Sequence, residues 1–209
     1  MIKGQKYVWY ASYGSNINSH RFLCYIQGGK PEGSSKVETG CKDPSLPLDE
    51  TNYIIDHPLY FAKDAGRWDF QGVAFIGLDK DETSNTLSKM YLITVEQFLD
   101  VVKQENNGIE FEIDLNEVKI HGSKIFREHA WYGNMLYLGE KNEYPIFTFT
   151  SPWGIDEIKW KKPSNPYLKT IITGLQETYT NKEIYEYFKD KPGIKGEYSD
   201  EELAKLISL

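Results

Sequence analysis

The sequence predicts a mixed α+β fold, formed by a single domain over residues 1–209. Apolar runs of strand length recur along the chain, and helices with recognisable caps lie among them and towards the end. Strands and helices do not alternate regularly, which favours an α+β arrangement over a doubly wound parallel sheet. The length allows one sizeable core, and the chain has no internal repeat.

The N-terminal part predicts a strand, a glycine turn, a helix and a long loop. Residues 7–10 are apolar and mostly aromatic, as in a buried strand, and residues 18–27 predict a helix that ends at Gly28 and Gly29. Residues 30–52 are rich in Gly, Ser, Pro and charge, which indicates a surface loop. Loops of this length are uncommon in compact domains, so two interpretations stay open: a functional flap and a plain insertion.

The remaining strands and the C-terminal helices follow from apolar runs and capping signals. Strands are predicted at 53–55, 59–62, 72–78, 89–93, 109–113, 118–121, 130–138 and 145–150, with a turn at 63–69 and a loop at 79–88. From about residue 166 the chain is predicted to be helical. Two of these helices begin with capping boxes, formed by Thr180 with Glu183 and by Ser199 with Glu202.

A further helix is predicted from residue 94 to about residue 106. Thr94 and Gln97 form a capping box at its start, and an Asn-Gly pair ends it. One face carries residues at spacings of three, four and three: Val95, Phe98, Val102 and Glu105.

Glu105 continues the apolar face of this helix, which should point towards the core. A carboxylate in such a place loses hydration, and this loss disfavours its charged form. The alternative is that Glu105, which lies in the last turn, extends into solvent.

The turn Tyr13-Gly14-Ser15-Asn16 follows the first strand and precedes the first helix. Glycine allows a tight turn and close approach of a ligand to the backbone. The first amides of a helix lack acceptors within the helix, so they can hold a carboxylate or a developing oxyanion. The alternative is a plain capped turn without a binding role.

Composition limits the function classes. The chain has 31 acidic and 24 basic residues, a net charge of −7, which argues against nucleic acid or an anionic membrane as its partner. Cys24 and Cys41 have no CxxC or Cys/His partner pattern, so we expect reduced structural cysteines rather than a zinc site or a disulfide. We expect a cytoplasmic protein, because no apolar signal core or long apolar run occurs.

Four ordered blocks of the chain resemble the gamma-glutamylcyclotransferase-like family. They are Tyr13-Gly14-Ser15-Asn16, then Leu59-Tyr60-Phe61 with Gly72-Val73-Ala74, then residues 90–105, and finally Pro163-Ser164 with residues 167–174. Each block is weak alone, whereas the ordered set across roughly residues 7–190 is fairly specific.

The resemblance implies a small mixed β-barrel with surrounding helices and a pocket at the barrel mouth. It also implies that Glu105 is the catalytic residue and that Tyr13, Gly14, Ser15, Asn16 and Tyr167 bind substrate, with no metal or organic cofactor. The implied partner is a small γ-glutamyl compound, as in glutathione metabolism. For Tyr167 the alternative is a packing role at a helix start.

The chain departs from the family pattern in two places. Well-studied members have a tyrosine a few residues after the glutamate, where this sequence has Phe111 and Glu112. The loop at 30–52 is also longer than in compact members. The first departure puts efficient turnover in question, and the second puts the substrate in question.

The implied reaction is an intramolecular cyclisation that releases 5-oxoproline. The α-amine of a γ-glutamyl group attacks its own γ-amide carbonyl, and one glutamate can serve as base and then as acid. Two alternatives stay open: a small-molecule binding module without turnover, and an enzyme with the same chemistry and another leaving group.

Other candidate residues have weaker patterns. Ser15 lacks the glycine-flanked elbow of a serine nucleophile. Trp68 and Trp153 can cover either a ligand or the core. The histidines are scattered without metal-ligand spacing, which predicts surface or capping roles: His20, His57, His121 and His129.

Overall fold

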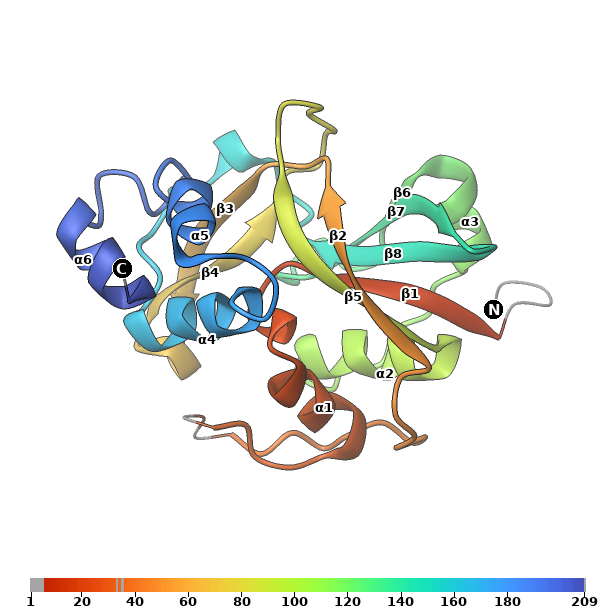
Figure 1. Cartoon of the computed structure of the whole chain (residues 1–209). Coiled ribbons are helices and arrows are strands. Elements are labelled where there is room, and N and C mark those ends of the chain that lie inside the picture. The colour runs from red at the N-terminus through yellow and green to blue at the C-terminus, as the bar shows by residue number, and fades with distance from the viewer. Residues whose placement is uncertain (1–5, 33, 35, 209) are drawn as a thin grey trace.

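The computed structural model describes residues 6–32, 34 and 36–208, and these residues form an α+β fold. The predicted fold class is therefore confirmed. Figure 1 shows the strands crossing the middle of the molecule and the helices packed around them.

The larger sheet has six strands in the order β2-β5-β1-β8-β7-β6. Strands β1 and β8 are parallel, and the other neighbours are antiparallel. The bounds of the six strands are β1 (Tyr7–Ser12), β2 (Asp49–Ile55), β5 (Thr86–Thr94), β6 (Ser123–Ile125), β7 (Asn134–Lys141) and β8 (Tyr144–Thr150).

The second sheet is an antiparallel pair, β3 (Leu59–Ala65) and β4 (Gln71–Ile76). Within the described residues, β2 and β6 form the two edges of the larger sheet, and no strand pairing joins them. The larger sheet therefore does not close into the small mixed β-barrel that the resemblance implies. Strands β3 and β4 pair with each other rather than closing the larger sheet.

Strand β1 is buried on both faces and separates two hydrophobic cores. Val8 and Tyr10 contribute to one core, which α1 (Ser19–Gln27) and α2 (Val95–Glu105) cover. Trp9 and Ala11 contribute to the other core. This second core includes β3, β4 and three C-terminal helices: α4 (Asn165–Leu175), α5 (Asn181–Phe188) and α6 (Asp200–Ile207).

The capping signals in the sequence identify helix starts correctly. Thr94, Thr180 and Ser199 are the N-caps of α2, α5 and α6, and each forms a complete capping box with the residue three positions later. The first helix is also confirmed, with Gly28 at its end in a positive-φ conformation.

The strands predicted at 109–113 and 118–121 are wrong. A helix, α3 (Leu115–His121), occupies the second segment, and residues 109–114 have no regular structure. The Asp114 side chain accepts a hydrogen bond from the backbone N–H of Asn116 and starts the helix. Leu115 and Val118 are buried three residues apart, a helical spacing that the short run did not reveal.

The predicted loop at 30–52 is too long, because β2 begins at Asp49. This strand pairs with β5 over its whole length, but it lies at the edge of the sheet with mostly exposed side chains, so it lacks an apolar pattern. Three other boundaries also shift: β3 continues to Ala65, β5 begins at Thr86, and β7 begins at Asn134 after a tight loop. No described helix has both the length and the apolar character needed to cross a bilayer.

Candidate active site

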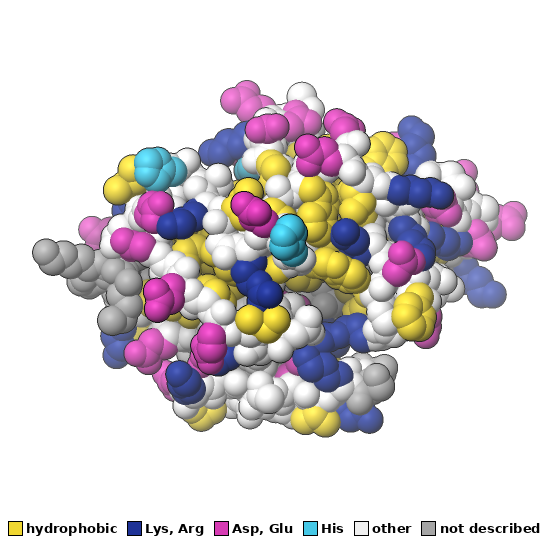
Figure 2. Space-filling model, turned by 180° about the vertical axis from the view of Figure 1, so that it is seen from behind, with side chains coloured by type: hydrophobic (Ala, Val, Ile, Leu, Met, Phe, Trp, Pro, Cys, Tyr) yellow, Lys and Arg dark blue, Asp and Glu magenta, His cyan; other side chains and the backbone are white. Residues whose placement is uncertain are grey.

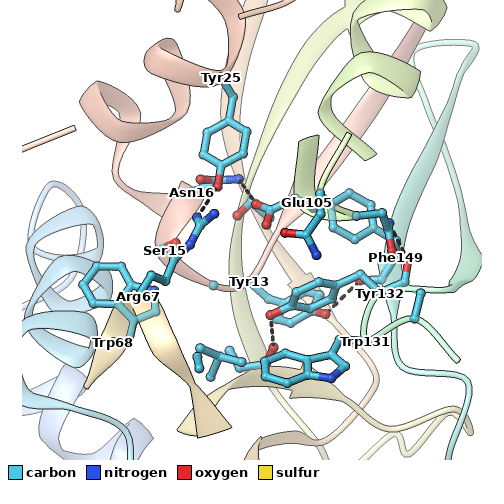
Figure 3. A pocket seen from close by; sticks show the side chains of 18 of the residues that line it. Tyr13, Ser15, Asn16, Tyr25, Arg67, Trp68, Glu105, Trp131, Tyr132 and Phe149 are labelled. Atoms are coloured by element: carbon cyan, nitrogen blue, oxygen red, sulfur yellow. Dashed lines mark hydrogen bonds between the residues drawn. The ribbon is translucent and has the colours of Figure 1, made fainter. Parts of the chain in front are cut away.

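A cavity of about 460 Å³ lies where β1, the end of α2, the start of α4 and two loops meet. Figure 3 shows side chains from these distant segments pointing towards one another around it. All six residues predicted for the site line this cavity: Tyr13, Gly14, Ser15, Asn16, Glu105 and Tyr167. Their roles in binding and catalysis stay predictions.

The turn after β1 is held by contacts on both sides. A 3₁₀ turn, η1 (Ser15–Ile17), follows Gly14, and the Asn18 side chain then caps α1. Gly14 has an ordinary negative φ of −108°. Its lack of a side chain matters for space instead, because a Cβ atom there would lie 3.2 Å from the hydroxyl of Tyr167.

Glu105 is half-buried at the C-terminal end of α2 and lies next to the turn. Its Oε1 atom accepts a hydrogen bond of 3.1 Å from Nδ2 of Asn16 (Figure 3). The carboxylate therefore lines the cavity beside the helix-start amides rather than extending away from the protein. Asn16 is 2% exposed, and its Oδ1 atom has no hydrogen-bond partner among the described residues.

Four tyrosines surround the carboxylate: Tyr10, Tyr25, Tyr132 and Tyr167. Burial raises the pKa of each one well above 10, and the negative charge of Glu105 raises each pKa further. Their hydroxyl groups therefore stay neutral at ordinary pH and can donate hydrogen bonds. The Tyr167 hydroxyl accepts a bond of 3.0 Å from the Ala74 N–H, so its own hydrogen remains to be donated.

Tyr13 has a more structural position than the sequence predicts. Its hydroxyl donates a 2.8 Å hydrogen bond to the carbonyl oxygen of Phe149, although the residue lines the cavity. Tyr132 similarly donates to the Ala74 carbonyl at 3.2 Å. These bonds fix two walls of the cavity through the backbones of β8 and β4.

Two arginines that the sequence did not single out lie at one end of the cavity. Arg21, in α1, is only 4% exposed, and its Nε atom donates to Oγ of Ser15 at 2.9 Å. Its guanidinium stacks over the Trp68 ring at 5.1 Å. Arg67 donates to the Tyr25 hydroxyl at 3.2 Å and to Glu38 at 3.4 Å.

Glu38 shows what the long loop contributes. Its side chain is 1% exposed and forms ion pairs with Lys36 and Arg67. Gln104, next to Glu105, accepts a hydrogen bond from the Gly40 N–H of the same loop. Burial lowers the pKa of Arg67, but Tyr25, Glu105 and Glu38 outweigh this effect and raise it. The loop therefore forms part of the scaffold that holds the cavity wall.

Comparison with solved structures identifies the fold. No protein-family model matches the chain. A solved gamma-glutamyl cyclotransferase is similar to it, with a TM-score of 0.53 and 15% identity over 97% of this chain and 99% of that one. A solved human protein, described as uncharacterized, is similar with a TM-score of 0.52 and 15% identity, over 98% and 100% of the two chains. The chain has the gamma-glutamyl cyclotransferase fold.

One curated relative is similar in sequence. Histone deacetylase 5 of Arabidopsis thaliana is 37% identical over 201 residues, which cover 88% of this chain. The chain spans only 30% of the length of that relative. The name of the relative therefore describes a protein much longer than the segment that is similar to this chain.

Phe111 and Glu112 stand where well-studied family members have a tyrosine, and in the structure other tyrosines lie near Glu105 instead. In this cyclotransferase-fold chain Phe111 packs against Phe126, with ring centroids 4.7 Å apart, and Glu112 is exposed; neither lines the cavity. Tyr10, Tyr25 and Tyr132 supply hydroxyl groups near Glu105 instead. Sequence reasoning missed them because residues from three separate segments reach the carboxylate only after folding.

Of the other candidate residues from the sequence, some line the cavity and others do not. Trp68 and His129 line it, whereas Trp153 packs against Phe75 at 5.7 Å. His57 is buried and forms a 2.8 Å hydrogen bond from its ring Nδ1 to the Gly77 carbonyl, so the surface or capping role predicted for it is wrong. Cys24 and Cys41 are free thiols. No group of three or more His, Cys, Asp or Glu side chains in the described part of the chain is placed to hold a metal ion.

Proposed function

We propose that the protein is a cyclotransferase that releases 5-oxoproline from a γ-glutamyl amine or γ-glutamyl amino acid, with Glu105 as general acid and base. One observation carries the proposal: the 3.1 Å hydrogen bond from Asn16 to Glu105. It places the carboxylate beside the helix-start amides in one cavity. The fold shared with a solved gamma-glutamyl cyclotransferase supports the same chemistry.

The first step forms the ring. Glu105 takes a proton from the α-ammonium group of the substrate, and the resulting amine attacks the γ-carbonyl carbon. A C–N bond forms, and the carbonyl oxygen gains negative charge. The amides of Ser15 and Asn16 and the hydroxyl of Tyr167 are donors for this oxyanion, and the loss of one such donor typically costs about 3 kcal/mol of barrier.

The second step breaks the γ-amide bond. The protonated Glu105 gives its proton to the leaving nitrogen, the C–N bond breaks, and the carbonyl reforms in 5-oxoproline. The ring nitrogen loses its second surplus proton to water, the leaving group departs as a neutral amine, and Glu105 is left as a carboxylate. Because the attacking and attacked groups belong to one molecule, a cavity that holds the substrate folded supplies much of the rate.

The test is an assay of 5-oxoproline release from a panel of γ-glutamyl amines, γ-glutamyl amino acids and glutathione. We expect at least one compound to turn over. Glu105→Gln should lower kcat on that compound by at least about 100-fold, because the amide neither accepts nor returns the proton. Glu112→Gln is the matched control, since this carboxylate is exposed and outside the cavity.

Normal turnover by Glu105→Gln would show that the catalytic assignment is wrong. The binding-module alternative predicts a different result. In that case a γ-glutamyl compound binds saturably to the wild-type protein in calorimetry, and no compound in the panel yields 5-oxoproline. The cytoplasmic location and the absence of a nucleic-acid partner stay predictions from the sequence.

A further inference from the structure

The cavity contains more positive charge than its own side chains neutralise. Arg21, Arg67 and Arg127 line it, and Glu105 is the one carboxylate among its described lining residues. Arg67 forms an ion pair with Glu38. Neither Arg21 nor Arg127 has a carboxylate within 4.0 Å in the described part of the chain.

Arg21 lies at the enclosed end of the cavity. Its Nε atom is bonded to Ser15 and its guanidinium stacks over Trp68, so its position is fixed. The Nη1 atom is buried without a hydrogen-bond partner among the described residues. Burying a guanidinium N–H group that has no acceptor is costly in free energy, whereas a carboxylate bound in bidentate fashion would complete the hydrogen bonds of the guanidinium. This atom therefore indicates a site for an anionic group beside the Gly14–Asn16 turn.

The backbone at Arg127 is held by a different element, the tight loop at 126–133. The backbone N–H groups of Phe126 and Arg127 both donate to the Gly133 carbonyl, at 2.9 and 3.1 Å. A Cβ atom on Gly133 would lie 1.9 Å from the Arg127 carbonyl oxygen, so only glycine allows this loop. The Nη1 atom of Arg127 is also buried without a partner in the described structure.

The two arginines belong to ends of the cavity that differ in exposure. Arg21 and Trp68 are 4% and 7% exposed, whereas the Arg127 end includes the exposed residues His129 and Ile109. In Figure 3, Trp68 lies towards the left of the view and Trp131 towards the right, and Glu105 lies above both. The enclosed end suits the constant γ-glutamyl part of a substrate, and the open end suits a variable leaving group.

We propose that Arg127 binds a carboxylate of the leaving group and that Arg21 binds the α-carboxylate of the γ-glutamyl part. The preferred substrates are then γ-glutamyl amino acids or short γ-glutamyl peptides rather than γ-glutamyl amines. This inference rests on the proposed function. The charges match: such a substrate has two carboxylates and one ammonium group, and the cavity offers Arg21, Arg127 and Glu105. A γ-glutamyl amine has one carboxylate and leaves Arg127 unpaired.

The test uses γ-glutamylalanine and γ-glutamylethylamide, which differ only in the leaving-group carboxylate. We expect the wild-type protein to favour γ-glutamylalanine by about 10-fold to 100-fold in kcat/KM, the range of one charge-assisted hydrogen-bonded pair. Arg127→Gln should reduce this ratio to near one, and Arg127→Lys should give an intermediate ratio. Lys124→Gln is the matched control, because it removes a neighbouring charge that pairs with Glu117 outside the cavity.

An unchanged ratio in Arg127→Gln, or a wild-type preference for the ethylamide, would overturn the inference and leave the proposed function intact. If neither compound yields 5-oxoproline, calorimetry with the same two compounds decides about the subsite, and the proposed function fails only if no other compound of the panel turns over. Binding of γ-glutamylalanine that weakens about 10-fold or more in Arg127→Gln supports the subsite. Equal binding to both proteins, or no binding, overturns it.

Discussion

The contact between Asn16 and Glu105 joins residues that are 89 positions apart in the chain. Asn16 gives its amide hydrogen to the carboxylate, which leaves its buried Oδ1 atom without a partner among the described residues. A buried acceptor without a donor costs about 1–3 kcal/mol. The ammonium group of a γ-glutamyl substrate is a donor that would remove this cost. In this way Asn16 would contact both the carboxylate and the ammonium group.

At the same scale, Tyr167→Phe should affect both stability and catalysis. The substitution removes the acceptor of the Ala74 N–H and leaves that group unpaired, which should cost about 1–2 kcal/mol of unfolding free energy. It also removes a donor beside Gly14, so kcat should fall by about 10-fold or more. Urea denaturation and 5-oxoproline release measure the two effects.

Tyr60→Phe separates these effects. Tyr60 is fully buried and its hydroxyl bonds Ser151 at 2.8 Å, but it does not line the cavity. The control should lose stability and keep its turnover. A Tyr167→Phe variant with the same kcat as Tyr60→Phe would contradict the role of Tyr167 as an oxyanion donor.

Among the elements, α2 and α4 position the site most directly. The capping box at Thr94 starts α2, and burial of Phe98 and Val102 orients the helix so that Glu105 reaches the cavity. Helix α4 brings Tyr167 to the other side of the Gly14 turn. Gly174 of α4 lies directly against the backbone of η1, which lets the helix and the turn approach closely.

Gly174→Ala should separate these two elements. A Cβ atom at this position would lie 2.6 Å from the backbone nitrogen of Asn18, and a backbone atom cannot move aside cheaply. We expect a net loss of about 1–3 kcal/mol of unfolding free energy, even though alanine favours the helix by about 1 kcal/mol. Gly154→Ala is the control, because its Cβ atom would have no contact closer than 3.8 Å and its φ is −74°. Equal stability of the two variants would contradict the close-packing argument.

At the scale of the whole molecule, charged side chains and tyrosine hydroxyl groups are distributed differently. Figure 2 shows acidic and basic side chains interspersed over one face, with hydrophobic side chains gathered near its centre. Aromatic hydroxyl groups, by contrast, are concentrated inside. Burial raises the pKa of the six buried tyrosines Tyr10, Tyr13, Tyr25, Tyr60, Tyr91 and Tyr167, and also of the half-buried Tyr132 and Tyr187.

These tyrosines predict a loss of stability in alkali. In the unfolded chain their pKa is near 10.0, whereas in the folded protein it is higher. Above about pH 10 the unfolded state therefore binds fewer protons than the folded state, and the unfolding free energy falls as pH rises. Each tyrosine contributes up to about 1.4 kcal/mol per pH unit between its two pKa values.

Urea midpoints measured between about pH 8 and about pH 11 check this prediction. The midpoint should be steady at the lower end and fall above about pH 10. Phenolate absorbance of the buried tyrosines should rise together with unfolding rather than before it. A midpoint that stays constant up to about pH 11 would show that the tyrosines ionise without a folding penalty.

The sequence alone determined the local features of this protein. Helix starts at Thr94, Thr180 and Ser199 were predictable because a capping box depends on residues only three positions apart. The α+β class and the central strands were predictable because burial produces apolar runs. The edge strand at Asp49 and the short helix at Leu115 were missed, since one has few buried side chains and the other is too brief to show a period.

Only the tertiary structure decided what surrounds Glu105 and how the sheet ends. Arg21 and Tyr25 of α1 and Arg127 and Tyr132 of the 126–133 loop carry no local signal of a site, because these two segments line the cavity with Glu105 only after folding. The sheet stays open because, among the residues that the structure describes, no strand pairs with the outer side of β2 or β6, and this depends on strand order rather than on any strand's own residues. Local patterns encode local hydrogen bonds and burial, whereas a cavity is made by contacts between segments far apart in the chain.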